Sequence, residues 1–126
     1  MTRISRFEEI EAWQTARELT RKVYETTNEG QFARDFGLKD QMRRASVSIM
    51  SNIAEGFESR TQTLFLDYLG RAKASAGELR AQLYAAQDVG YLDQSQYEQM
   101  HELVDKCSRQ LSKFMTYLVS QKAKNV

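Results

Sequence analysis

The sequence lacks several features that would place it in common classes of protein. It has no proline, one cysteine and one histidine in 126 residues. Because Cys107 alone cannot form an internal disulfide, a reduced, cytoplasmic location fits best. No apolar run approaches the roughly 18 residues of a membrane span, and residues 1–9 lack the apolar segment of a secretory signal. We therefore expect a cytoplasmic protein that has no membrane partner.

Neither sign of charge dominates the chain. Its 18 Lys and Arg residues against 17 Asp and Glu residues give a net charge of +1, so the whole chain is not a strongly basic nucleic-acid-binding protein. The charges are unevenly placed, because residues 81–105 hold acids without Lys or Arg, and residues 106–126 hold bases without acids. A helix dipole explains this order, since it favours acids at its start and bases at its end. The alternative is a basic end that meets phosphates.

Catalytic and metal-binding patterns are missing as well. Glu98-x-x-His101 has the spacing of half a di-iron site, but there is no second histidine to complete it. Zinc needs more Cys and His ligands than the chain has. Cys107 lies on an apolar seam and predicts a buried, unreactive thiol. No glycine-rich phosphate-binding motif occurs. We expect a protein that is not an enzyme and that uses no cofactor and no metal.

The residues that are present favour an all-α chain. No segment shows the strict alternation and β-branched enrichment of a strand. Four apolar-periodic stretches follow one another along the chain, and glycines fall between them or near their ends, at Gly30, Gly37, Gly56 and Gly90. The first stretch has an acidic first turn at Glu8, Glu9 and Glu11. We predict helices at about residues 8–28, 38–57, 62–89 and 94–121.

The third and fourth stretches carry the clearest pattern. Their apolar residues recur at alternating spacings of three and four, the heptad repeat of helices that supercoil with a left hand. The two seams are Phe65, Leu69, Ala72, Ala76, Leu79, Leu83 and Ala86, then Tyr97, Met100, Val104, Cys107, Leu111, Phe114 and Leu118. Gly90, followed by Asp93 or Ser95 as an N-cap, predicts a short antiparallel connection. The expected fold is one domain, 1–126, an antiparallel left-handed four-helix bundle.

The second predicted helix has two apolar faces. At about 100° per residue, one face collects the apolar residues that should enter the core. That face consists of Leu38, Met42, Ala45, Ile49, Ile53 and Gly56. Val47, Met50 and Ala54 lie on a second face with Arg43. Because a helix with two apolar faces has two surfaces to bury, we expect Val47, Met50 and Ala54 to contact another subunit.

A polar stripe runs between the two apolar faces. It consists of Gln41, Arg44, Ser48, Asn52 and Glu55. One interpretation is a satisfied polar network that fixes the register of packing. The other is a surface that, together with Arg43, faces a ligand or partner. The sequence leaves both open.

The same helix carries the longest motif in the chain. It reads Gly37-Leu38-x-x-Gln41-x-Arg43-Arg44-Ala45-x-x-Ser48-Ile49-x-x-Asn52-Ile53-Ala54-Glu55-Gly56, joined by Trp13-x-x-Ala16, Phe65-Leu66, Glu78-Leu79 and Gly90-Tyr91-Leu92. These residues resemble the bacterial four-helix-bundle family named after proteins encoded in intervening sequences of 23S rRNA genes. The resemblance implies a homopentameric ring, and it brings no established activity.

The accessory proteins of diversity-generating retroelements look similar to this family. They form such rings and bind nucleic acid and a reverse transcriptase. The present chain departs from its family in having Met50 where members often carry proline, and Ala74-Ser75 where many have Gly-Ser. These departures concern the close packing of helices or the bound partner more than the fold.

The sequence thus predicts a ring-forming binding module that engages RNA or DNA weakly. The candidate contacts are Arg43, Arg44, Arg60, Arg71 and Lys73. In a ring each basic surface is repeated, and the electrostatic attraction grows with every phosphate contacted. The alternative is a scaffold for a protein partner with no nucleic-acid role, which the net charge near zero favours.

Overall fold

A computed structural model describes the backbone of residues 4–124 and the side chains of residues 4–121. Within that range the chain forms four α-helices and no strand. The helices are α1 Glu11–Thr27, α2 Phe36–Glu58, α3 Gln62–Asp88 and α4 Gln94–Lys124. Two short 3-10 helices, η1 Phe7–Glu9 and η2 Phe32–Arg34, precede α1 and α2. The all-α prediction is confirmed, and each predicted helix is present with its ends shifted by a few residues.

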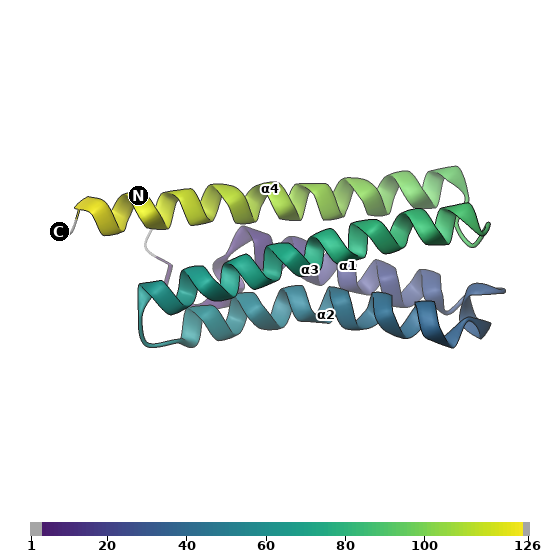
Figure 1. The fold of residues 1–126 in the computed structure, drawn as a ribbon, viewed down its shortest axis with the longest axis horizontal. Coiled ribbons are helices and arrows are strands. Elements are labelled where there is room, and N and C mark those ends of the chain that lie inside the picture. The colour runs from purple at the N-terminus through teal and green to yellow at the C-terminus, as the bar shows by residue number, and fades with distance from the viewer. Residues whose placement is uncertain (1–3, 125–126) are drawn as a thin grey trace.

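The four helices pack side by side in chain order. Each helix contacts the next one along the chain, and α1 closes the ring against α4. Consecutive helices run in opposite directions, and α4 projects past the turn between α2 and α3 (Figure 1). The seam between α1 and α2 therefore lies on the opposite side of the bundle from the seam between α3 and α4. The left-handed supercoil stays a prediction of the heptad spacing.

The heptad residues form the core. In α3 the seam is buried from Leu69 to Ala86, and in α4 it is buried from Tyr97 to Leu111. Beyond Leu111 the seam residues Phe114 and Leu118 are only half-buried. Burial of each large aliphatic side chain contributes roughly 1.5–3 kcal/mol to folding. The core therefore holds the bundle most tightly in its middle and loosens where α4 projects.

Gly56 allows α2 and α3 to approach closely. A β-carbon placed on this residue would lie 2.8 Å from Cβ of Tyr68 and 2.9 Å from a ring carbon of Phe65. Those distances are shorter than two carbon atoms in van der Waals contact can adopt. The closest part of the α2–α3 interface therefore depends on the missing side chain.

The start of α2 differs from the prediction. Asp35 is its N-cap, with Oδ1 accepting a hydrogen bond from the backbone N–H of Leu38 at 3.1 Å. The hydroxyl of Tyr91, on the connection between α3 and α4, donates to Oδ2 of Asp35 at 2.9 Å. Gly37 lies inside the helix instead of ending the preceding connection, because the cap at Asp35 begins the helix at Phe36, two residues before the predicted start.

The acidic first turn expected for the first helix is also displaced. Glu8 and Glu9 belong to η1, and of the three acids only Glu11 lies in the first turn of α1. Glu9 instead accepts hydrogen bonds from the N–H and hydroxyl of Ser5, at 2.8 and 3.1 Å. By contrast, the predicted cap at Asp93 is confirmed, since its Oδ1 accepts from the N–H of Gln96 at 2.8 Å.

Candidate nucleic-acid interface

Arg43 is bound to α1. Its Nε donates to the hydroxyl of Thr27 at 2.9 Å, and a second nitrogen donates to the carbonyl of Tyr24 at 3.4 Å. The guanidinium also lies over the ring of Tyr24, 4.4 Å from its centre. These contacts use much of the donor fork that would otherwise bind a phosphate. Arg43 therefore holds α1 and α2 together.

Arg44 lies beside it but is exposed to solvent. It borders a shallow hollow of about 490 Å³ that is also lined by Tyr24, Asp40 and Val47. Within residues 4–121 the guanidinium has no ion pair and no hydrogen bond. Of the two adjacent arginines, Arg44 is the one available to a partner.

The other three candidate cations lie elsewhere on the bundle. Arg71 pairs with Asp67 at 3.1 Å, and its guanidinium lies 5.2 Å from the ring centre of Tyr68. Lys73 donates to the hydroxyl of Ser108 at 3.1 Å and so bridges α3 and α4. Arg60 is exposed in the turn between α2 and α3.

The five candidate cations do not form one patch. Arg43 belongs to the α1–α2 seam, whereas Lys73 belongs to the α3–α4 seam on the opposite side. Arg44 and Arg60 are the two whose side chains are exposed and unpaired in the described part of the chain. A single subunit thus offers a few separated cations instead of a continuous basic surface.

The polar stripe of α2 is divided between the inside and the outside. Ser48 shares a hydrogen bond of 3.0 Å with the hydroxyl of Ser75 on α3. The amide of Asn52 donates to the hydroxyl of Ser48 at 3.0 Å and to its carbonyl at 2.8 Å. Gln41, Arg44 and Glu55 face solvent. The inner half therefore fixes the register of α2 on α3, and the outer half is free to meet a partner.

The second apolar face of α2 is narrower than the helical wheel suggests. Val47 is exposed, with 39% of its surface accessible. Met50 is partly buried and packs against the core of its own subunit, and Ala54 is half-buried. The exposed apolar surface of this face is therefore centred on Val47.

The side chains considered for catalysis or metal binding, Cys107 and His101, pack against other residues of the bundle. Cys107 is fully buried, its sulfur lies 3.5 Å from the carbonyl of Ala12, and burial raises the pKa of its thiol to about 12. His101 packs with the rings of Tyr84 and Tyr97. Across the described residues, His, Cys, Asp and Glu side chains do not gather in threes that could hold a metal. No helix in that part of the chain is long and apolar enough to cross a membrane.

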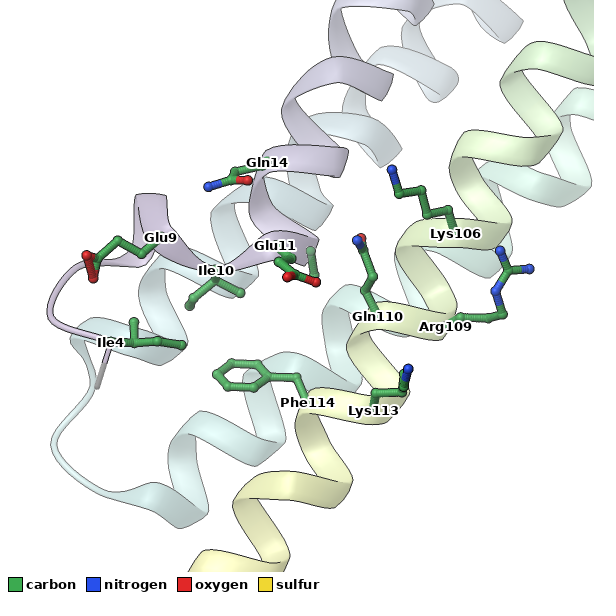
Figure 2. Close-up of a pocket in the computed structure, with 11 residues that line it drawn as sticks. Ile4, Glu9, Ile10, Glu11, Gln14, Lys106, Arg109, Gln110, Lys113 and Phe114 are labelled. Carbon is green, nitrogen blue, oxygen red and sulfur yellow. The ribbon is translucent and has the colours of Figure 1, made fainter. Parts of the chain in front are cut away.

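A groove that the sequence did not predict lies between the N-terminal segment and α4 (Figure 2). Residues from Ile4 to Gln14 line one side, and residues from Lys106 to Phe114 line the other. Sequence reasoning missed it because it depends on where α1 starts relative to α4. The signal available in the sequence was the run of bases, without acids, that begins at Lys106.

Comparisons with known proteins agree with this architecture. No curated protein matches the chain. A crystal structure from Bacteroides thetaiotaomicron, of a protein of unknown function from the S23 ribosomal protein family, superposes with a TM-score of 0.77 at 21% identity. The superposition covers 83% of this chain and 95% of that one, and it supports the fold. The sequence pattern of the 23S rRNA-intervening sequence protein family matches residues 8–113. This chain therefore belongs to the 23S rRNA-intervening sequence protein family.

Proposed function

We propose that this protein is a non-enzymatic module that assembles into a homo-oligomeric ring and binds RNA or DNA weakly through repeated cations. The observation that carries the proposal is the outer face of α2, where exposed Arg44 lies beside exposed Val47. Val47 supplies an apolar contact for a neighbouring subunit, and Arg44 supplies charge at the edge of that contact. The name of the family, which refers to an intervening sequence of 23S rRNA, makes RNA the first ligand to test.

The assembly is needed because one subunit has few available cations. Its net charge is +1, and Arg44 and Arg60 are the exposed, unpaired members of the candidate set within residues 4–121. The attraction for a nucleic acid grows with the number of phosphates neutralised. A ring, for which we propose five subunits, presents each cation five times. The proposal also draws on the similar accessory proteins of diversity-generating retroelements, which form such rings and bind nucleic acid.

Binding to a nucleic acid is tested by mobility shift at low and moderate salt. We expect the wild-type assembly to shift 23S rRNA fragments or single-stranded RNA at low salt. Apparent affinity should fall as salt rises, by about 0.7–0.9 log units per log unit of salt for each phosphate contacted. The double variant Arg44→Gln/Arg60→Gln should lose most of this binding.

The double variant Arg71→Gln/Lys73→Gln is the matched control, because it also removes two positive charges and both side chains already have partners, Asp67 and Ser108. This control should reduce nucleic-acid binding less than Arg44→Gln/Arg60→Gln does. No shift of any of these nucleic acids at low salt would contradict the proposal. Equal losses of nucleic-acid binding in the control and in Arg44→Gln/Arg60→Gln would contradict it as well.

A protein scaffold without a nucleic-acid role is the second candidate. Two exposed apolar side chains favour it, Leu64 with 43% and Val119 with 54% of their surfaces accessible. A pull-down from lysate with and without nuclease separates the two functions. Partners that are retained unchanged after nuclease treatment support the scaffold, and partners lost with the nucleic acid support the first proposal.

A further inference from the structure

The groove beside α4 has the size of a site for a small molecule. Its volume is about 800 Å³, and such sites commonly enclose about 300–1,000 Å³. The groove exists because α1 begins at Glu11 while α4 continues to Lys124. The residues before α1 turn away from α4 through η1, and this leaves one side of α4 open (Figure 2).

One end of the groove is apolar. The side chains of Ile4, Ile10 and Phe114 point toward one another there (Figure 2). Ile10 is 2% exposed, while Ile4 and Phe114 are half-buried and keep accessible surface toward the groove. A hydrocarbon chain or ring placed among them would be removed from water, which favours binding.

The other end carries an unused hydrogen-bond acceptor. Oε1 of Gln110 is buried, and no donor in the described part of the chain reaches it. In Figure 2 the amide of Gln110 extends from α4 into the groove, toward the start of α1. A buried acceptor without a donor is unfavourable, so a rotation of the Gln110 side chain that brings Oε1 to an O–H or N–H group of a ligand would be favoured.

Two lysines flank this acceptor on α4. Lys106 and Lys113 are seven residues apart, which places them two turns apart on one face of the helix. Within residues 4–121, neither of them has an ion pair or a hydrogen bond. Arg109, on the same stretch of helix, is already paired with Asp105.

The carboxylates of the groove lie on its other side. Glu9 accepts both hydrogen bonds from Ser5, and its side chain points away from α4 (Figure 2). Glu11 stands at the mouth, across from Gln110, and repels an anion from the α1 side. The position that suits a negative group is therefore on the α4 side, between the two lysines.

We propose that this groove binds an anionic amphiphile. The anionic head lies between Lys106 and Lys113, and an amide or hydroxyl of the ligand donates to Oε1 of Gln110. The apolar part lies among Ile4, Ile10 and Phe114. The site is separate from the outer face of α2, so it does not depend on the proposed nucleic-acid binding.

Three probes of equal chain length test the three parts of the site. Octanoate carries the anionic head and a seven-carbon alkyl chain. N-octanoylglycine adds an amide N–H to the same chain, and heptyltrimethylammonium replaces the anion by a cation. Calorimetry should rank N-octanoylglycine above octanoate by several-fold, with no measurable binding of the cation. Amide shifts in NMR spectra should concentrate in residues 4–14 and 106–118. Equal binding of the cation, no binding of either anion, or shifts confined to other residues would overturn the proposal.

Variants then assign the contacts. The double variant Lys106→Gln/Lys113→Gln should weaken octanoate by about tenfold or more, because both charge-assisted contacts are lost. Arg80→Gln, which removes one exposed positive charge from α3, is the control and should leave binding within about twofold. Gln110→Leu should remove the advantage of N-octanoylglycine over octanoate. An undiminished advantage in Gln110→Leu, or unchanged octanoate binding in the double lysine variant, would contradict the assignment.

Discussion

At the scale of single residues, two glycines inside helices of this bundle have opposite surroundings. Gly56 faces the Cβ of Tyr68 and the ring of Phe65 at distances that leave no room for a methyl group. Gly77, in α3, has nothing within 4 Å of the position its β-carbon would take. The same substitution therefore has a different physical consequence at each position.

We predict that Gly56→Ala lowers the free energy of unfolding by about 2 kcal/mol, because overpacking outweighs the gain in helix propensity. Gly77→Ala should raise it by about 0.5–1 kcal/mol, since only the propensity changes. Urea unfolding followed by circular dichroism at one protein concentration measures both. If Gly56→Ala is as stable as the wild type, the close approach of α2 and α3 is wrong.

The residue scale also marks the limit of sequence reasoning about the site. A helical wheel places Arg43 and Arg44 about 100° apart on α2, Arg43 with the second apolar face and Arg44 in the polar stripe. It does not reveal that Thr27 and Tyr24 engage Arg43 and leave Arg44 exposed. That distinction depends on the register of α1 against α2, which only the packed bundle defines.

At the scale of the elements, the start of α2 depends on a contact between distant parts of the chain. Asp35 caps the helix and accepts a hydrogen bond from Tyr91, which lies next to Gly90 in the connection between α3 and α4. This hydrogen bond is the main cause that raises the pKa of Tyr91 above its usual value. The protonated form of Tyr91 is therefore the one that stabilises the fold.

We predict that Tyr91→Phe lowers the unfolding midpoint at neutral pH, because Asp35 loses a donor. The contribution of Tyr91 is complete below the pKa of an unfolded tyrosine, about 10, and is lost as pH rises through the raised pKa of the folded state. The difference between wild type and Tyr91→Phe should therefore shrink in strongly alkaline buffer. Thermal unfolding at neutral and alkaline pH measures it, and a difference that is independent of pH would refute the role of this hydrogen bond.

The helices show why heptad spacing predicts buried residues better than glycine positions predict helix ends. The heptad spacing predicts the buried residues of both seams, from Leu69 to Ala86 and from Tyr97 to Leu111, while Phe65, Phe114 and Leu118 at the seam ends are only partly buried. Because glycine often ends a helix, the sequence favours a break at Gly37, yet the cap at Asp35 places Gly37 inside α2. A break predicted at a glycine considers only neighbouring residues. The start of α2 also involves the hydrogen bond from Tyr91 to Asp35, which joins distant parts of the chain.

At the scale of the whole molecule, the proposals use different surfaces. The proposed oligomer and nucleic-acid contacts use exposed Val47 and Arg44 on the outer face of α2, whereas the proposed small-molecule site uses two lysines and the apolar end of the groove beside α4. With a net charge of +1, a single subunit has little general attraction for either kind of anion. Both proposals therefore rest on the local placement of charge, and the nucleic-acid proposal rests in addition on assembly of several subunits.

The charge along α4 fits this view. Acids precede Lys106 and bases follow it, an order that suits the helix dipole and also places the lysines at the groove. From the sequence alone, the alternatives were the helix dipole and a basic end that meets phosphates. The groove adds a third explanation, a small anionic ligand. The binding of octanoate and the effect of the double lysine variant decide whether the basic half has a ligand.

The measurement that tests the central claim most directly is the mass of the native particle, by light scattering on the wild type and on Val47→Glu. The account predicts a wild-type mass of about five subunits, the number that the family resemblance implies. Val47→Glu should fall to the mass of one subunit at unchanged helicity, because a charge at the centre of an apolar contact is costly to bury. A wild type with the mass of one 14.6 kDa chain, or an assembly that Val47→Glu leaves intact, would contradict the account.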